Sequence, residues 1–309
     1  MILIQIRYPF LTSSSCMEHF TDDIIEDVER NPYILTNRNH KKDALEVADA
    51  IARHQEFDSN CSERLSSHCR FVVMKLVHMH KSYWISKELV MSSLCEHLRT
   101  NEWATTITDT DANEVIVSTC INDPCPSEAE FVSLRFLQAE EYELSMALSK
   151  ILNTNSIPSK DVDMLIDPSL DPEQVIAVRT CLRSSLVVTG KAGTGKTKVI
   201  KEMVRMLTLA NIRVRLCAPT GKAAVRMSEG IGIKATTLHF AIASAMSEEP
   251  CEEAVIIDEA SMLAPPLLLK FLKSSKVVRL ILVGDHNQLP SIDPGSLMKD
   301  VILSGRFPV

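Results

Sequence analysis

The stretch Leu-Val-Val-Thr-Gly-Lys-Ala-Gly-Thr-Gly-Lys-Thr, residues 186–197, decides the fold of the carboxyl-terminal half of the chain. A short apolar, β-branched run enters a glycine-rich turn, and the apolar side chains between Lys196 and Leu209 have helical spacing. The pattern Gly190-x-x-x-x-Gly195-Lys196-Thr197 is a P-loop. Its glycines let successive N–H groups turn inward around a phosphate chain, and the following helix directs its positive end to the same place.

The P-loop predicts a site for ATP and Mg²⁺. We expect Lys196 to reach the β- and γ-phosphates and the Thr197 hydroxyl to bind Mg²⁺. The remaining phosphate-contacting residues are those of the turn: Gly190, Gly193, Thr194 and Gly195. Because a strand and a helix flank the turn, the sequence predicts an α/β domain with a parallel sheet flanked by helices.

Length and composition fit a globular protein of two or three domains. The chain has 309 residues, of which 45% are hydrophobic and 24% charged. No run approaches the roughly 18 apolar residues of a membrane span, so we expect no membrane association and a cytoplasmic or nuclear location. Nine cysteines without a Cys-x-x-Cys pair indicate reduced thiols. The spacing of Cys61, Cys69, His78 and His80 matches no standard zinc site.

Charge and glycine divide the chain into two parts. Residues 1–160 contain 15 Lys and Arg against 24 Asp and Glu, whereas the rest is slightly basic. All nine glycines lie between Gly190 and Gly305. Three prolines cluster with Asn, Ser and Asp in residues 153–172, which is typical of a linker. The sequence therefore predicts an accessory domain at 1–160 and an ATPase domain at 161–309.

The accessory domain is expected to be mainly helical, with a strand at Glu114–Thr119. Its expected helices are Asp22–Arg30, Leu45–His54, Cys69–His78, a segment capped by Ser86, and a longer stretch in Glu128–Leu152. Two helices followed by a strand pair suit a winged-helix module. Because no Lys/Arg cluster precedes residue 160, we expect a structural or protein-contacting domain rather than a DNA-binding one.

Two carboxylates follow an apolar strand that begins at Ala254. Asp258 is expected to hold the Mg²⁺ hydration shell, and Glu259 to accept a proton from the attacking water or to orient it. After a second buried strand, Val277–Val283, Gln288 is placed to contact the γ-phosphate. His286 and Asn287, which lie between this strand and Gln288, are expected to form a solvated turn.

Further polar residues follow other predicted strands. Thr220 and Lys222 come after Arg213–Ala218, and Thr237 and His239 open the next helix. Ligands of open parallel sheets bind at the carboxyl ends of the strands, so these residues are expected on the working edge. Gln174, which precedes the first strand, has an amide that can pair with an adenine edge.

Five motifs in order resemble the RecD-like helicases of superfamily 1. They are Gly-Lys-Ala-Gly-Thr-Gly-Lys-Thr (190–197), Ala-Pro-Thr-Gly-Lys-Ala-Ala (218–224), Thr-Leu-His (237–239), Ile-Asp-Glu-Ala-Ser-Met (257–262) and Gly-Asp-x-x-Gln-Leu-Pro (284–290). The resemblance implies a P-loop NTPase (RecA-like) motor that moves five-prime to three-prime on single-stranded DNA while hydrolysing ATP. It implies Gln174 at adenine, Lys196, Glu259 and Gln288 in catalysis, and Thr197 and Asp258 at the metal. It also implies Thr220, Lys222, Thr237 and His239 along the DNA.

The chain departs from that family in two places. Phe240–Glu253 is short for the β-hairpin with which relatives separate strands, and residues 1–309 do not include the family's second motor domain with its arginines. We therefore expect weak Mg·ATP binding, slow or no hydrolysis by these residues alone, and a protein partner that supplies the second motor domain. The alternative is a non-motor ATP-binding or interaction protein derived from a split or decayed helicase. The Gly-Asp-x-x-Gln-Leu-Pro motif disfavours a different P-loop ATPase such as an AAA+ protein.

Overall fold

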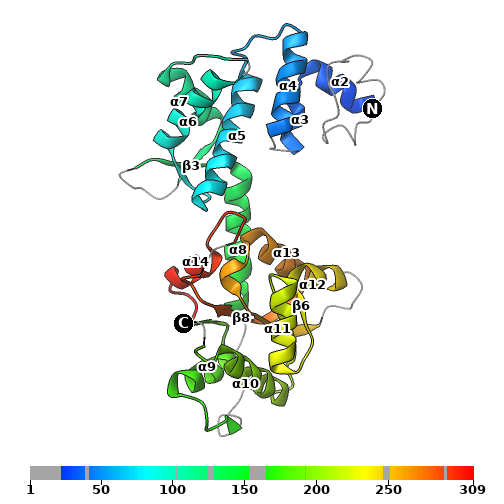
Figure 1. Ribbon diagram of the computed structural model, residues 1–309, viewed down its shortest axis with the longest axis vertical. Coiled ribbons are helices and arrows are strands. Elements are labelled where there is room, and N and C mark those ends of the chain that lie inside the picture. Colours follow the sequence, from blue (N-terminus) through cyan, green and yellow to red (C-terminus); the bar gives the residue numbers. More distant parts are fainter. Residues whose placement is uncertain are drawn as a thin grey trace. The chain divides into compact units, whose positions relative to one another are not determined.

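The computed structural model describes residues 22–38, 42–101, 103–123, 129–152, 165–191, 193–245, 251–288 and 291–309. The chain divides into two compact units, residues 1–138 and 139–309 (Figure 1). Within the described ranges, no helix is both long and apolar enough to cross a membrane. The same residues contain no group of three or more His, Cys, Asp or Glu side chains suited to a metal ion.

The first unit is mainly helical, as the sequence predicted. Its elements are α2 (Asp22–Arg30), α3 (Ile34–Arg38), α4 (Lys42–His54), α5 (Ser62–His80), β1 (Ile85–Ser86), α6 (Lys87–Thr100), α7 (Asp109–Thr119), β2 (Ile121–Asn122) and β3 (Phe131–Ser133). The three strands form an antiparallel sheet in the order β1-β3-β2. With α5, α6 and α7, this order agrees with a winged-helix module.

The strand expected at Glu114–Thr119 is wrong, because these residues form the end of α7. The helix begins with a capping box in which the Thr108 hydroxyl accepts from the Asp111 N–H and the Asp111 carboxylate accepts from the Thr108 N–H. Ala112 and Ile116, four residues apart, are both buried on one helical face. The cap and this spacing together outweigh the β-propensity of the Val-Ile-Val run.

The helix α8 (Arg135–Leu152) contains the boundary between the units. The boundary at Gln138 lies earlier than the one expected after residue 160. Leu137 packs in the core of the first unit, whereas Leu144, Leu148 and Ile151 pack in a core of the second unit. Apolar side chains at helical spacing therefore assign most of α8 to the second unit.

The second unit has a five-stranded parallel sheet in the order β4-β8-β7-β5-β6. Its strands are β4 (Leu186–Thr189), β5 (Arg213–Ala218), β6 (Ala235–Thr237), β7 (Glu252–Ile257) and β8 (Lys276–Gly284). Its helices after α8 are α9 (Pro172–Arg183), α10 (Lys196–Leu209), α11 (Gly221–Ile231), α12 (Leu238–Ala245), the 3₁₀ turn η3 (Ala260–Met262), α13 (Pro265–Ser274) and α14 (Leu297–Leu303).

The helices cover both faces of this sheet. From β4 to β6 the chain advances across the sheet through α10 and α11, and then it returns to β8 through α12 and α13. Because each parallel crossover is right-handed, the outward and return connections lie on opposite faces. Alternate residues of β7 accordingly enter two cores, with Ile256 packed on the face of α9–α11 and Val255 on the face of α8, α12, α13 and α14.

Candidate nucleotide-binding site

The predicted site residues follow the carboxyl ends of the five parallel strands. The P-loop follows β4, Thr220 and Lys222 follow β5, His239 follows β6, Asp258 and Glu259 follow β7, and Gln288 follows β8. Since all five strands run in the same direction, their carboxyl ends form one edge of the sheet. The topology thus brings together residues that lie far apart in the sequence.

The P-loop has a backbone that only glycine adopts readily. Gly193 and Gly195 both have a φ of +83°, which lies in the left-handed region. Gly195 is the N-cap of α10, so the first free N–H groups of that helix face the loop. Lys196 Nζ donates to the carbonyl of Gly190 at 2.7 Å and to that of Lys191 at 2.9 Å. The ammonium group is therefore held at the mouth of the loop by two neutral acceptors.

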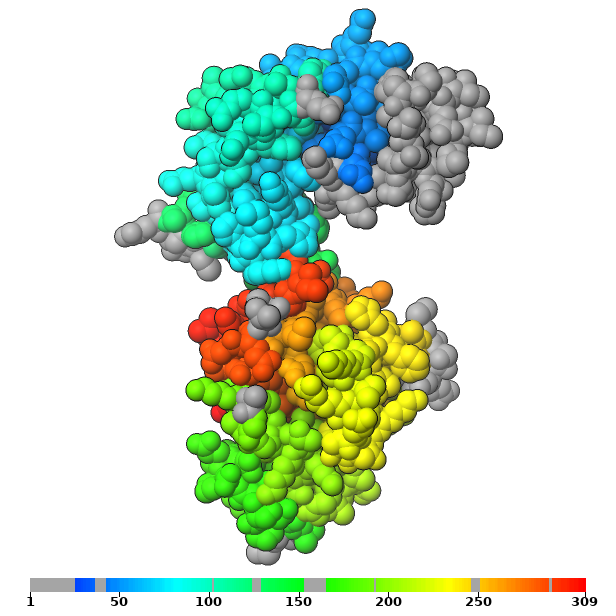
Figure 2. Space-filling model, in the orientation of Figure 1, coloured from blue at the N-terminus to red at the C-terminus, as the bar shows by residue number. Residues whose placement is uncertain are grey.

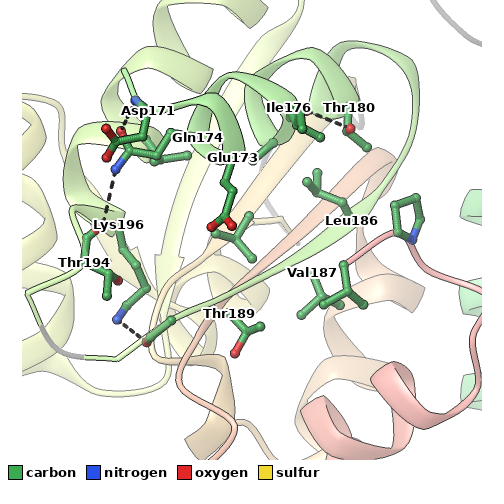
Figure 3. Close-up of a pocket in the computed structure, with 16 residues that line it drawn as sticks. Asp171, Glu173, Gln174, Ile176, Thr180, Leu186, Val187, Thr189, Thr194 and Lys196 are labelled. Carbon is green, nitrogen blue, oxygen red and sulfur yellow. Dashed lines mark hydrogen bonds between the residues drawn. The ribbon is translucent and has the colours of Figure 1, made fainter. Parts of the chain in front are cut away.

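A cavity of about 750 Å³ extends from the P-loop along α9 (Figure 3). Gly190, Thr194 and Lys196 line one end, and the apolar wall at the other end comes from α9, β4 and the last residues of the chain. Pro308 reaches this wall because its carbonyl accepts a hydrogen bond from the Val187 N–H at 2.8 Å. The cavity combines a cationic end with an apolar end, as a nucleoside triphosphate requires.

Polar side chains of α9 line this cavity, among them those of Gln174 and Glu173. Gln174 accepts from the Asp171 N–H at 3.2 Å and donates to the Thr194 carbonyl at 3.3 Å, so it links the start of α9 to the P-loop. Its assignment to adenine stays a prediction. Glu173, which the sequence analysis did not single out, projects from α9 into the middle of the cavity (Figure 3). In the sequence, only its position directly before Gln174 indicated that Glu173 could lie at the site.

Asp258 and Glu259 lie where β7 ends, as predicted. Burial raises the pKa of the Asp258 carboxyl, while a hydrogen bond from the Glu259 N–H and the positive charges of Lys196 and Arg226 oppose that shift. Asp258 is therefore within electrostatic reach of the P-loop lysine. Glu259 has a φ of +54°, a left-handed conformation that is strained for a residue with a Cβ atom. Strain of this kind is common where a side chain must be aimed at a ligand.

The donor set fits Mg²⁺. A carboxylate and a hydroxyl are hard oxygen ligands, and Mg²⁺ retains several waters when it is held by one or two protein groups. Thr197 is exposed in the first turn of α10, and a Cβ atom on Gly230 of α11 would lie 2.8 Å from its methyl group. The absence of a side chain at Gly230 therefore leaves the space that Thr197 occupies.

His286 is not a freely solvated turn residue. Its Nδ1 lies 2.7 Å from the Thr189 hydroxyl, so the loop after β8 is joined to the last residue of β4, directly before the P-loop. Asn287 is exposed, as expected. Gln288 is exposed beside His286 and Ser261 in a small cavity. No sequence signal pointed to the His286 contact, because it joins residues 97 positions apart.

The residues assigned to DNA lie at two helix starts. The Thr220 hydroxyl caps α11 by accepting from the Ala223 N–H at 3.3 Å, and Lys222 in the first turn is exposed. The Thr237 hydroxyl accepts from the Phe240 N–H at 3.2 Å, and His239 is exposed beside it. The segment Phe240–Glu253, which is short for a strand-separating β-hairpin, continues α12 to Ala245, and residues 246–250 lie outside the described residues.

Comparison with known proteins gives two kinds of match. A family model described as an AAA domain matches residues 169–308. The ATP-dependent RecD2 DNA helicase of Deinococcus radiodurans is 37% identical over 36% of this chain and 16% of its own length. The RecBCD enzyme subunit RecD of Haemophilus influenzae is 26% identical over 59% of this chain and 36% of its own length. DNA helicase B of Mus musculus is 24% identical over 83% of this chain and 29% of its own length.

These matches bear on the expectations from the motifs. The chain spans between 16% and 36% of the length of these three relatives. The matching family model is described as an AAA domain, although the Gly-Asp-x-x-Gln-Leu-Pro motif disfavours an AAA+ protein. The three relatives, by contrast, are two DNA helicases and a RecD subunit. The match to the AAA domain covers α9, the P-loop and the five-stranded sheet.

Proposed function

We propose that this chain is a RecD-like helicase that binds Mg·ATP and couples ATP hydrolysis to movement on single-stranded DNA, which its match to an AAA domain over residues 169–308 and its similarity to the RecD2 DNA helicase support. The single observation that carries the proposal is that the positive charge of the P-loop residue Lys196 acts on Asp258 at one edge of the sheet, and that Lys196 lines a cavity of about 750 Å³. A lysine and a carboxylate from separate strands, beside a glycine-rich turn, form the core of a P-loop ATPase site.

Each residue has a proposed role. Lys196 exchanges its two carbonyl acceptors, Gly190 and Lys191, for phosphate oxygens. Thr197 and Asp258 hold Mg²⁺, which neutralises the charge of the β- and γ-phosphates when it is bound. Glu259 orients the attacking water or accepts its proton. Gln288 contacts the γ-phosphate, and Gln174 contacts adenine.

The DNA-facing part of the proposal concerns α11 and α12. Thr220, Lys222, Thr237 and His239 contact single-stranded DNA at the carboxyl edge of β5 and β6, with movement from five-prime to three-prime. In the first unit, the exposed residues of α7 include Asp109, Asp111 and Glu114, and acidic side chains repel phosphate. We therefore propose that this face of the first unit contacts protein. A protein partner also supplies the arginines of a second motor domain.

Nucleotide binding tests the central claim without requiring turnover. A fluorescent ATP analogue is titrated into the chain with and without Mg²⁺, using Lys196→Ala and, as a matched control from the same helix, the exposed Lys201→Ala. We expect Lys196→Ala to weaken binding at least tenfold and Lys201→Ala to change it less than twofold. Equal, Mg²⁺-independent binding by all three proteins would contradict the proposal.

Hydrolysis and unwinding test the finer claims. DNA-stimulated turnover by these 309 residues, lost in Lys196→Ala, would show that no partner is needed for hydrolysis. Duplexes with a single five-prime or three-prime tail then test direction, and the proposal requires that the five-prime tail be preferred. Nucleotide binding without any effect of DNA would favour a non-motor ATP-binding protein.

A further inference from the structure

Helix α11 contacts the proposed ATPase site at two points. Lys222, Arg226 and Gly230 are spaced by four residues, so they occupy successive turns along one side of the helix. Arg226 Nη1 lies 3.9 Å from a carboxylate oxygen of Glu259, and Gly230 lies against Thr197. The same side of α11 therefore joins the residue assigned to DNA, Lys222, to residues assigned to hydrolysis and to Mg²⁺.

The ion pair between Arg226 and Glu259 is poorly suited to stabilising the fold. The side chains are 74% and 29% exposed, and exposed pairs at this distance contribute little to the free energy of unfolding. Glu259, by contrast, has a left-handed backbone conformation, which is strained for a residue with a Cβ atom. A cation beside a strained carboxylate at a ligand-binding edge is better explained by a role in the reaction than by a role in folding.

The surroundings of Arg226 support this interpretation. Its positive charge also acts on Asp258, the other carboxylate that follows β7. Figure 2 shows the yellow-green to yellow segment that contains α11 and α12 on the surface of the second unit. A long, exposed arginine can exchange a carboxylate for a phosphate oxygen at little cost, because both accept from its planar fork of donors.

We propose that Arg226 is a positioning residue that holds the Glu259 carboxylate, and that single-stranded DNA bound at Thr220 and Lys222 changes this contact and thereby controls hydrolysis. This inference rests on the proposed function. DNA that contacts the first turn of α11 reaches Arg226 one turn later, and Arg226 in turn faces Glu259. The helix thus provides a direct route from DNA to the residue assigned to water activation.

The Nε–Hε signal of Arg226 in an ¹⁵N NMR spectrum tests the contact without requiring turnover. The signal is identified by its loss in Arg226→Lys. We expect the Arg226 signal to shift in Glu259→Gln. We also expect a saturating thymidine oligonucleotide to shift the signal in the wild-type chain, but much less in Glu259→Gln. The matched control is the signal of Arg179, exposed on α9, which neither change moves. An Arg226 signal that stays in place when the oligonucleotide is bound would overturn the inference.

Hydrolysis gives the second readout. We expect DNA to stimulate ATP hydrolysis at least tenfold less in Arg226→Gln than in the wild-type chain, and Arg226→Lys to recover part of this stimulation. We expect the double variant Arg226→Gln/Glu259→Gln to lose no more DNA stimulation than Glu259→Gln alone. Undiminished stimulation in Arg226→Gln would overturn the inference and leave the proposed function intact. Failure of the wild-type chain to bind the oligonucleotide would overturn both. The NMR signal decides the inference where turnover is too slow to measure.

Discussion

Arg64 and Asp49 form a buried two-point ion pair between α5 and α4. Arg64 Nε donates to one carboxylate oxygen at 3.0 Å and Nη2 to the other at 3.2 Å, with side-chain exposures of 0% and 3%. Tyr33 and His68 also contact this carboxylate, at 2.7 Å and 3.2 Å. A buried charge with several partners is costly to leave unpaired.

We expect Asp49→Ala to destabilise the first unit by about 3–5 kcal/mol, because it strands the Arg64 charge in the core. Chemical denaturation, followed by a probe in the first unit, measures this difference in the free energy of unfolding. The matched control is Glu130→Ala, which breaks the largely exposed pair with Lys87 and is expected to cost less than about 1 kcal/mol. Equal losses for the two variants would show that the Asp49 network contributes no more than a surface contact.

The same network predicts an acid-dependent loss of stability in two steps. Burial lowers the pKa of His97 to about 4, and the nearby charges of His68 and Lys75 act in the same direction. The unfolded chain therefore binds a proton at His97 that the folded chain rejects, and stability falls as the pH drops from about 6.5 towards 4, by on the order of 1 kcal/mol. We expect His97→Gln to remove this slope in denaturation curves measured between these pH values.

The second step lies at lower pH and reports on Asp49. Burial alone would raise the pKa of Asp49, but hydrogen bonds and positive charge from His68 and Arg64 outweigh it and lower the pKa to about 2. This contribution to stability is present above the ordinary pKa of about 4 and is lost as the pH falls towards 2. We expect His97→Gln to keep this lower step of the stability loss and to remove the upper one. An upper step that persists in His97→Gln would contradict its assignment to His97.

The sheet of the second unit was predictable where a strand leads directly into a turn residue. The sequence predicted β4 and β5 with the bounds that the structure has, because these short segments run into turns that begin at Gly190 and Pro219. The three residues of β6 gave no such run, so only the helix that follows them was foreseen. In α7, a Val-Ile-Val run concealed a helix whose determinants are the cap at Thr108 and the burial of Ile116.

The candidate site was predictable as a set of motifs but not as a set of contacts. Motif residues follow strand ends, and parallel strands bring those ends to one edge, so their common location follows from the pattern. The contacts of Arg226 with Glu259 and of Thr189 with His286 join residues 33 and 97 positions apart, depend on how a helix or loop packs there, and have no local sequence signal. The same is true of Gly230, whose neighbour Thr197 is on another helix.

The hydrogen bond between Thr189 and His286 predicts that these residues affect turnover more than binding. Thr189→Val keeps the shape of the side chain but removes the partner of His286 at 2.7 Å. Because the contact ties the loop of Gln288 to the start of the P-loop, we expect kcat for ATP hydrolysis to fall about threefold to tenfold while the Kd for Mg·ATP changes less than twofold. Thr189→Ser, which retains the hydroxyl, serves as the control, and an equal loss in both variants would exclude the hydrogen bond as the cause.

The substitution Gly230→Ala is expected to stabilise helix α11 but to weaken Mg·ATP binding. Gly230→Ala adds a Cβ atom 2.8 Å from the Thr197 methyl group, and Thr197 can relieve the clash only by rotating, which also moves the hydroxyl assigned to Mg²⁺. We expect Mg·ATP binding to weaken about tenfold, while the melting temperature is unchanged or higher because alanine favours a helix by about 1 kcal/mol over glycine. Thr197→Ser in the Gly230→Ala background removes the clashing methyl and keeps the hydroxyl, so it should restore most of the affinity. If the double variant bound Mg·ATP as weakly as Gly230→Ala, the contact between α11 and Thr197 would not be what sets the geometry of the metal site.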